Sequence, residues 1–295
     1  MTSSSRAAPA TRRRPAIPPT GLVVIGIASV QLGSAVAKNL FQSLGPGGMA
    51  FLRVALAACI LMAVWRPGYR GQGARALALA ALFGLVTAAM NFSFYEALDR
   101  IPLGIAVTIE FCGPLGVAIA GSRRALDVLF VLLATAGIVL LAPWGGMHLN
   151  VLGASLALVA AACWAAYIYL SQAIGRVFPG GGGLALAMAI GGLALLPIGV
   201  AGAGANLFEP HLLLGALSVS LLSSVIPYSC ELEALRSLPA QVFGVLMSLE
   251  PAAAAIAGFL ILHEVLGARE LTAILLVTAA SVGAARTGTS PAPID

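Results

Sequence analysis

Ten apolar segments, each about 20 residues long, follow one another along the chain. A bilayer has a hydrocarbon core of roughly 30 Å, which an α-helix of about 20 residues crosses. Because no water satisfies the backbone there, only helices and closed barrels span it. We therefore predict an all-α integral membrane protein with ten transmembrane helices, at residues 21–42, 47–65, 76–97, 101–121, 126–143, 151–174, 183–202, 211–230, 239–262 and 268–285.

The composition leaves little chain for anything outside the membrane. Of the 295 residues, 60% are hydrophobic and 9% are charged, whereas about a quarter of an ordinary soluble domain is charged. Connections between the predicted spans are short, so the function must lie within the membrane. We predict a disordered cytoplasmic tail at residues 1–19 and a short cytoplasmic tail at residues 289–295.

Arginine placement predicts the orientation. With ten helices, twelve arginines fall on the side that holds both termini, and only Arg100 and Arg269 fall on the other. Positive residues accumulate on the cytoplasmic side of membrane proteins, so both termini are expected in the cytoplasm. This distribution accounts for the net charge of +5 without a nucleic-acid partner.

An internal repeat divides the chain. Glu96-Ala97-Leu98 returns 137 positions later as Glu233-Ala234-Leu235, and at the same offset five of eight residues are identical between 114–121 and 251–258. We predict one repeat over residues 20–146 and another over 147–288, each with five helices. Because each repeat has an odd number of helices, the second copy enters the membrane in the opposite orientation to the first. Many secondary transporters are built from inverted repeats, with the substrate site where the repeats meet; a stable bundle without activity is the structural alternative.

Four charged residues lie inside predicted spans and away from the span ends: Lys38, Arg53, Glu110 and Glu250. Each would cost about 2.5 to 3.5 kcal/mol if it faced lipid, so they are expected to face the protein interior or a cavity. There, a carboxylate can carry a proton or accept an ammonium group. Alternatively, the glutamates form buried ion pairs with Lys38 or Arg53, and Lys38 extends to the membrane surface.

Other polar and aromatic residues recur at helical spacing, which places them on single helix faces. They are Gln31 with Lys38, Asn91 with Tyr95, and Trp164 with Tyr167, and Tyr228 follows a proline near the end of its span. Such faces would line a substrate cavity, or they would hydrogen-bond between helices.

Three prolines inside apolar segments are predicted hinges or gates: Pro114, Pro227 and Pro251. A proline within a helix frees the carbonyl four residues earlier and kinks the helix. Capping of freed backbone by nearby side chains is the alternative.

Enzyme classes find no support in the sequence, because hydrolase, zinc-protease, P-loop and dinucleotide motifs are absent. The four cysteines lie inside predicted helices without CxxC spacing, so we expect neither a disulfide nor a metal. No cofactor is expected, although proton coupling is compatible with the buried carboxylates.

Several short motifs carry a family resemblance that extends over nearly the whole chain. They are Gln31, Ala37-Lys38, Met90-Asn91, Phe94-Tyr95, Glu110-Phe111, Gly113-Pro114, Cys163-Trp164, Pro227-Tyr228 and Glu250-Pro251. With them the chain resembles the EamA family of the drug/metabolite transporter superfamily. The resemblance implies ten helices in two inverted five-helix repeats, a bacterial inner-membrane location and export of small metabolites.

We therefore expect an exporter of small amino acids such as threonine or homoserine that works by alternating access, as a monomer or weak dimer. Lys38 or Arg53 would meet the substrate carboxylate, and Glu110 or Glu250 its ammonium group. A multidrug or other metabolite exporter of the same fold is one alternative, although only 6% of residues are aromatic. A lipid-handling protein, with its polar track open to the bilayer, is another.

Overall fold

The computed structural model describes residues 17–67, 72–120, 150–238, 246–265 and 267–287, together with single positions within 121–149 and 239–245. Within this part of the chain every regular element is a helix. The prediction of an all-α protein is confirmed for these residues. Of the predicted span at 126–143 only single positions are described, and most of both predicted tails lie outside the described residues.

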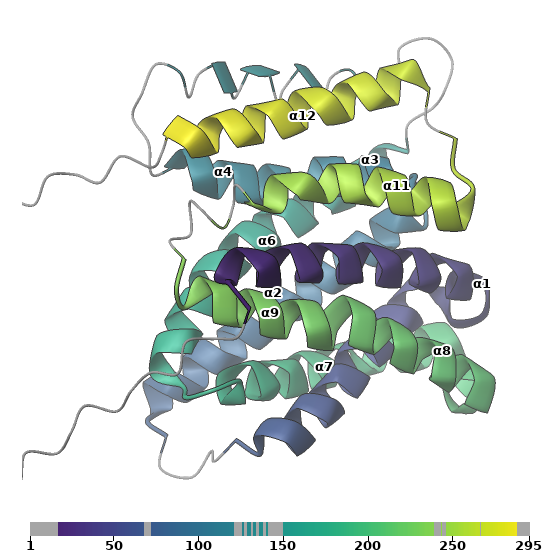
Figure 1. Cartoon of the computed structure of the whole chain (residues 1–295). Coiled ribbons are helices and arrows are strands. Elements are labelled where there is room, and N and C mark those ends of the chain that lie inside the picture. Colours follow the sequence, from purple (N-terminus) through teal and green to yellow (C-terminus); the bar gives the residue numbers. More distant parts are fainter. Residues whose placement is uncertain are drawn as a thin grey trace, which may run out of the picture.

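The first helix, α1 (Pro19–Trp65), joins two predicted spans in one element. Its interruption is Gly45, whose backbone has φ 66° and ψ 159° and is followed by Pro46. Glycine is the residue that adopts this positive φ without steric cost. The chain turns back at this kink (Figure 1), so the two halves of α1 act as separate arms.

Three further helices match predicted spans closely: α2 (Ala74–Leu98), α6 (Val151–Val177) and α7 (Gly182–Ala203). The start of α6 is capped by Asn150, whose Oδ1 accepts a hydrogen bond from the Gly153 N–H at 3.0 Å. Such a cap satisfies one of the free N–H groups that every helix start leaves.

The next span is segmented. It consists of α8 (Pro210–Ser220), a π-helical segment (Leu221–Val225) and α9 (Ile226–Leu235). The sequence predicted its end at residue 230, five residues too early. The helix continues because its polar residues find partners, with Glu231 bonded to Tyr167 and Glu233 paired with Arg236.

Two predicted spans are also broken near their middles. In place of one helix over 101–121 the structure has α3 (Leu103–Glu110) and α4 (Cys112–Ala120). A short 3-10 turn (Met247–Leu249) precedes α11 (Glu250–Leu262). The last described helix is α12 (Ala268–Thr287).

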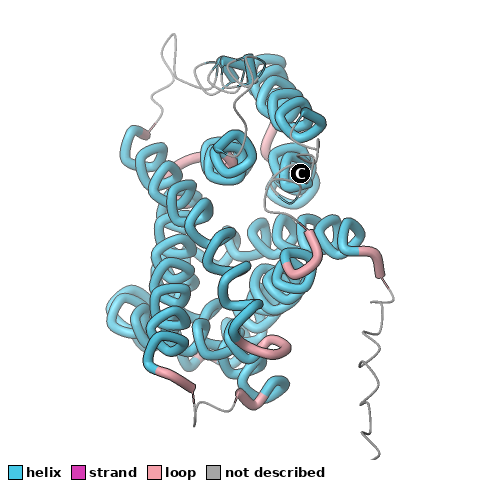
Figure 2. The backbone as a smooth tube through the Cα atoms, turned by 90° about the vertical axis from the view of Figure 1, so that its left-hand side faces the viewer, coloured by secondary structure: helices cyan, strands magenta, loops and turns pink. Residues whose placement is uncertain are grey.

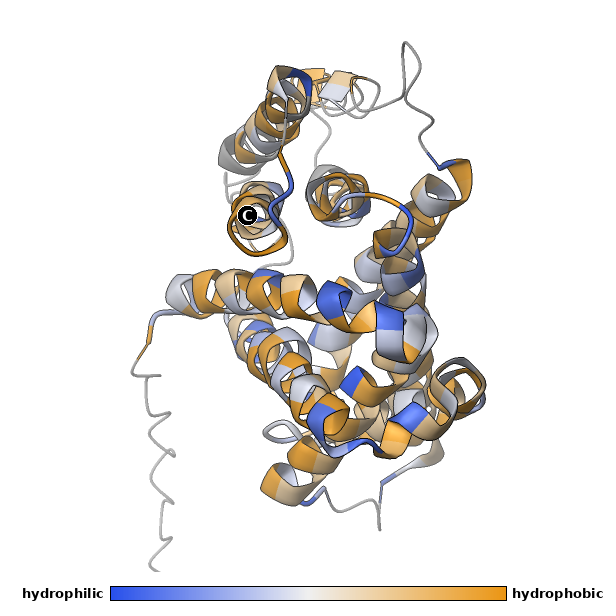
Figure 3. Cartoon of the chain, turned by 90° about the vertical axis from the view of Figure 1, so that its right-hand side faces the viewer, coloured by the Kyte–Doolittle hydropathy of each residue, from blue (hydrophilic) through white to orange (hydrophobic). Residues whose placement is uncertain are grey.

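By length and composition, five helical stretches of the described residues can cross a membrane. They are Pro19–Trp65, Ala74–Leu98, Val151–Val177, Gly182–Phe208 and Pro210–Leu235. Shorter apolar helices cover Leu103–Val117, Glu250–Leu262 and Leu271–Ala280. Hydrophobic colour covers most of the helical length in Figure 3, with isolated hydrophilic residues between.

The helices form two groups. In Figure 1, α3, α4, α11 and α12 lie above α1, α2, α7, α8 and α9, and Figure 2 shows the same division from the side. Helix α6 contacts α3 and α4 as well as α2, so it joins the two groups. Aromatic residues such as Phe83, Phe111 and Tyr167 are fully buried inside the molecule. Polar residues that share this interior define the site.

Candidate functional site

A cavity lies among six helices, α1, α2, α3, α6, α9 and α11. Both groups of helices therefore contribute to its wall. The lining residues are Val30, Gln31, Ser34, Arg53, Met90, Asn91, Phe94, Val107, Glu110, Trp164, Tyr228, Glu231 and Glu250. One guanidinium and three carboxylates thus face a single space, beside apolar and aromatic side chains.

Arg53 is only 3% exposed and is held by the segmented helix that faces it. Its Nε donates to Ser224 Oγ at 2.8 Å, and its Nη2 donates to the Ser223 carbonyl. Pro227 has no N–H, so the Ser223 carbonyl four residues earlier is free to accept this bond. The π-helical segment and its proline thereby create the acceptor that holds the guanidinium.

Aromatic side chains also surround Arg53. Its guanidinium carbon lies 5.3 Å from the ring centroid of Tyr95 and 5.8 Å from that of Tyr228. Cations are attracted to the face of an aromatic ring at such distances, more strongly where water is excluded. The arrangement stabilises a positive charge at this wall without an ion pair to any residue that the structure describes.

Asn91 and Tyr228 join α2 to α9 at the cavity. Asn91 Nδ2 donates to the Tyr228 hydroxyl at 2.9 Å and to the Thr87 carbonyl at 2.7 Å. Tyr228 is also within hydrogen-bond distance of Arg53 Nη2, at 3.3 Å. The three side chains therefore form one connected polar wall.

The three carboxylates have different neighbours. Glu250 accepts a hydrogen bond from Gln31 Nε2, and Glu231 accepts one from the Tyr167 hydroxyl at 2.9 Å. Glu110, at the end of α3, is 7% exposed and lines the cavity. In the described part of the chain, none of the three forms an ion pair with a basic side chain.

The balance of charges in the cavity determines which ligands it can accept. Three carboxylates outnumber one guanidinium, and burial of unbalanced charge is costly unless a counter-charge is supplied. An ammonium group or a proton provides that counter-charge. The remaining donors of Arg53 and Gln31 are available to an anionic group.

The structure brings most of the predicted site residues together. Those on the cavity wall are Gln31, Arg53, Asn91, Glu110, Trp164, Tyr228 and Glu250. Tyr95 and Tyr167 are fully buried beside it, where they contact Arg53 and Glu231 respectively. Lys38 lies elsewhere and pairs with Glu264, with 2.8 Å between Nζ and Oε1.

The predicted hinges each occupy a helix break. Pro114 follows the interruption between α3 and α4, Pro227 follows the π-helical segment, and Pro251 follows the 3-10 turn before α11. Pro114 removes the donor for the Glu110 carbonyl, so the backbone next to this carboxylate leaves regular helix geometry.

Glu231 is the ionisable cavity residue that the sequence did not indicate. Its side chain is 4% exposed. The predicted span ended at residue 230, which placed Glu231 in a connection. A helix extended by one turn would have shown that Tyr228 and Glu231, three residues apart, share a face.

Membrane-capable helices around a buried polar cavity are the arrangement expected of a membrane transporter. The profile of the EamA-like transporter family matches residues 151–286. Relatives at 40 to 41% identity match over 94% of the chain. The chain belongs to the EamA family of transporters.

Two relatives show how far the similarity extends. The chain is 41% identical over 280 residues to "Threonine/homoserine exporter RhtA" of Salmonella typhimurium strain SL1344, covering 94% of each chain. It is 40% identical over 279 residues to the protein of the same name from Escherichia coli strain K12, again over 94% of each. A solved crystal structure with 19% sequence identity shares the fold, with a TM-score of 0.64 over 92% of this chain and 100% of its own.

Proposed function

We propose that this protein exports small amino acids related to threonine and homoserine across the bacterial inner membrane by alternating access. The cavity is its substrate site. The observation that carries the proposal is the lining of that cavity, where one guanidinium and three carboxylates meet inside an otherwise apolar protein. Relatives that share two fifths of the sequence along nearly the full length bear the name of such exporters.

A zwitterionic amino acid fits this chemistry. Its ammonium group needs an anionic partner once it leaves water, and Glu110 and Glu250 provide one from α3 and α11. Its carboxylate needs donors, which the guanidinium of Arg53 provides from α1. Trp164, Met90 and Phe94 form the apolar boundary for a small side chain.

We further propose that the ten helices form two inverted five-helix repeats. Helix boundaries in the two halves recur at the offset of 137 residues found in the sequence, which supports this proposal. Shifted by 137, the range 74–98 of α2 becomes 211–235, and the stretch from α8 to α9 covers Pro210–Leu235. Gly45, the kink of α1, shifts to Gly182, the first residue of α7.

Contacts between equivalent residues support the same symmetry. Asn91 and Tyr228 are 137 positions apart, and they hydrogen-bond to each other. Ala55 and Gly192 are also 137 apart, and a methyl group added at Gly192 would lie 3.3 Å from Ala55 Cα. Residues related by a two-fold axis touch only near that axis. The proposed axis therefore passes through the cavity, where inverted-repeat transporters bind their substrates.

Proton antiport is the coupling that we propose. When an ammonium group leaves, the surplus of carboxylates in the cavity requires another positive charge. A proton taken from the outer side and released to the cytoplasm would meet this need and drive export. Both termini are cytoplasmic in this arrangement.

The test is counterflow of labelled threonine in liposomes that contain the purified protein. Saturable uptake that unlabelled homoserine competes is the expected result, and an imposed pH gradient should change its rate. A flux whose rate does not depend on the pH gradient would indicate facilitated diffusion instead of proton antiport. No flux with any amino acid, in correctly inserted protein, would exclude the proposed substrates and direct the same assay to drugs or lipids.

A further inference from the structure

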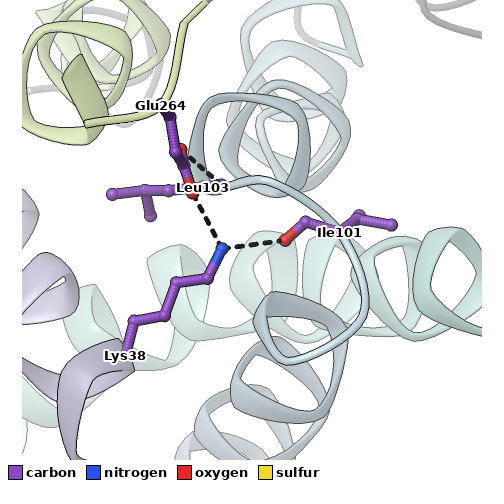
Figure 4. A network of polar contacts seen from close by, with 4 residues as sticks. All are labelled: Lys38, Ile101, Leu103 and Glu264. Atoms are coloured by element: carbon purple, nitrogen blue, oxygen red, sulfur yellow. Dashed lines mark hydrogen bonds and ion pairs between the residues drawn. The ribbon is translucent and has the colours of Figure 1, made fainter. Parts of the chain in front are cut away.

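A second cluster of polar contacts lies outside the cavity and joins three helical segments (Figure 4). Lys38 Nζ, on α1, is 2.8 Å from Glu264 Oε1 and 3.4 Å from the Ile101 carbonyl. The Leu103 N–H donates to Glu264 Oε2 at 3.3 Å. We call Lys38, Ile101, Leu103 and Glu264 the end cluster.

The backbone holds Glu264 in position. His263 ends α11 in the left-handed conformation with φ 54°, and the Glu264 N–H bonds back to the Gly258 carbonyl at 3.1 Å. A Cβ added at Gly258 would lie 2.7 Å from Glu264 Oε2. The absence of a side chain at Gly258 therefore leaves room for the carboxylate.

Leu103 is the first residue of α3. The first N–H groups of a helix have no partner within that helix, and they carry partial positive charge. Glu264 thus accepts from a helix start and from an ammonium group at once. A single carboxylate connects α1, α3 and the end of α11.

The same three helices contribute to the wall of the cavity. Seven residues of α1 separate Gln31 from Lys38, a rise of about 10 Å. Gln31 contacts Glu250 at the start of α11, and Lys38 contacts Glu264 just beyond its end. Separation of α1 from α11 at the end cluster would therefore open the cavity toward that end of the molecule.

We propose that the end cluster is the gate through which substrate leaves on the side of the membrane opposite the termini. The side chains of Lys38 and Glu264 are 25% and 17% exposed, so water replaces their contacts at modest cost when the helices part. Assignment to the outer side rests on the orientation in the proposed function.

The test measures access to a cysteine in the cavity. The four native cysteines are replaced by serine, and Ser34→Cys, or Val107→Cys as a second reporter, is exposed to a membrane-impermeant thiol reagent. Intact cells present the outer side and inverted vesicles the inner side. We expect Glu264→Gln and Lys38→Met each to increase outer-side labelling about fivefold. The double variant should label no faster than the faster single variant, because both changes open one contact.

Two further variants provide an independent disruption of the end cluster and a control. Gly258→Ala retains both charges but displaces the Glu264 carboxylate, so it should also accelerate labelling. Glu209→Gln removes an exposed carboxylate near His211, outside the end cluster, and should leave labelling unchanged. Acceleration seen only in inverted vesicles would retain the gate and reverse the proposed orientation. Unchanged labelling from both sides in the end-cluster variants would overturn the gate, whatever the substrate, because labelling requires none.

Discussion

At the residue scale, the site is a set of buried polar groups whose partners lie on other helices. Arg53 bonds to residues about 170 positions away, and Gln31 to one 219 positions away. The sequence identified Arg53, Glu110 and Glu250 because an ionisable residue in an apolar segment must avoid lipid. It did not indicate that Arg53 bonds to serine and tyrosine side chains, or that Glu250 bonds to a glutamine.

The first prediction concerns the two central carboxylates. Glu110→Gln and Glu250→Gln should each reduce threonine counterflow at least about tenfold, because a neutral amide lacks the charge that balances an ammonium group. Flux is normalised to the amount of inserted protein, and Glu209→Gln, with its exposed side chain, is the control. Two fully active variants would remove these carboxylates from the mechanism.

A second prediction concerns the partner of Glu231. Tyr167→Phe removes the hydroxyl that donates to this buried carboxylate at 2.9 Å. Loss of such a donor should lower the free energy of unfolding by about 1 to 3 kcal/mol, seen as a lower thermal midpoint in detergent. Tyr169→Phe on the same helix is the matched control, because Tyr169 is 50% exposed. Equal midpoints for both variants would contradict the structural role of this bond.

At the scale of the element, helix breaks place functional groups. The π-helical segment with Pro227 turns a carbonyl toward Arg53, and the interruption after Glu110 lies beside the cavity. Prolines visible in the sequence predicted that breaks would occur. The form of each break depended on the neighbouring helix, since freed carbonyls are stable in a membrane only where another group satisfies them.

Close packing at one of these broken helices supplies the third prediction. A Cβ at Gly113 would lie 2.2 Å from the Ala161 carbonyl oxygen on α6. Gly113→Ala should therefore force α4 away from α6 and lower the free energy of unfolding by about 1 to 3 kcal/mol.

Gly116→Ala is the control for this packing on the same helix. No atom lies within 4 Å of a Cβ added at Gly116. Its thermal midpoint should be unchanged or slightly raised, because alanine favours a helix more than glycine does. A Gly113→Ala protein as stable as Gly116→Ala would disprove the close approach.

At the scale of the whole molecule, two groups of helices meet at a polar cavity, and the repeat offset relates elements on both sides of it. Orientation in the membrane follows from arginine placement along the chain rather than from packing. It therefore requires its own measurement.

The fourth prediction concerns the membrane topology, with the C-terminus in the cytoplasm and the connection before α8 on the other side. A fluorescent protein fused after the C-terminus should be fluorescent, and alkaline phosphatase fused there should be inactive, because both report a cytoplasmic position. Phosphatase inserted in the connection before α8, at residues 204–209, should be active. The opposite pattern would invert the proposed direction of export.

The sequence by itself determined that this is a helical membrane protein with a repeat, and it identified most of the cavity residues. It did so because lipid imposes strict rules on backbone and charge that each residue obeys locally. Only the tertiary structure decided that Glu231 joins the cavity and that Lys38 pairs with Glu264 instead. Those outcomes depend on which helices touch and how far each one continues, and the contacts that settle them join residues 64 and 226 positions apart.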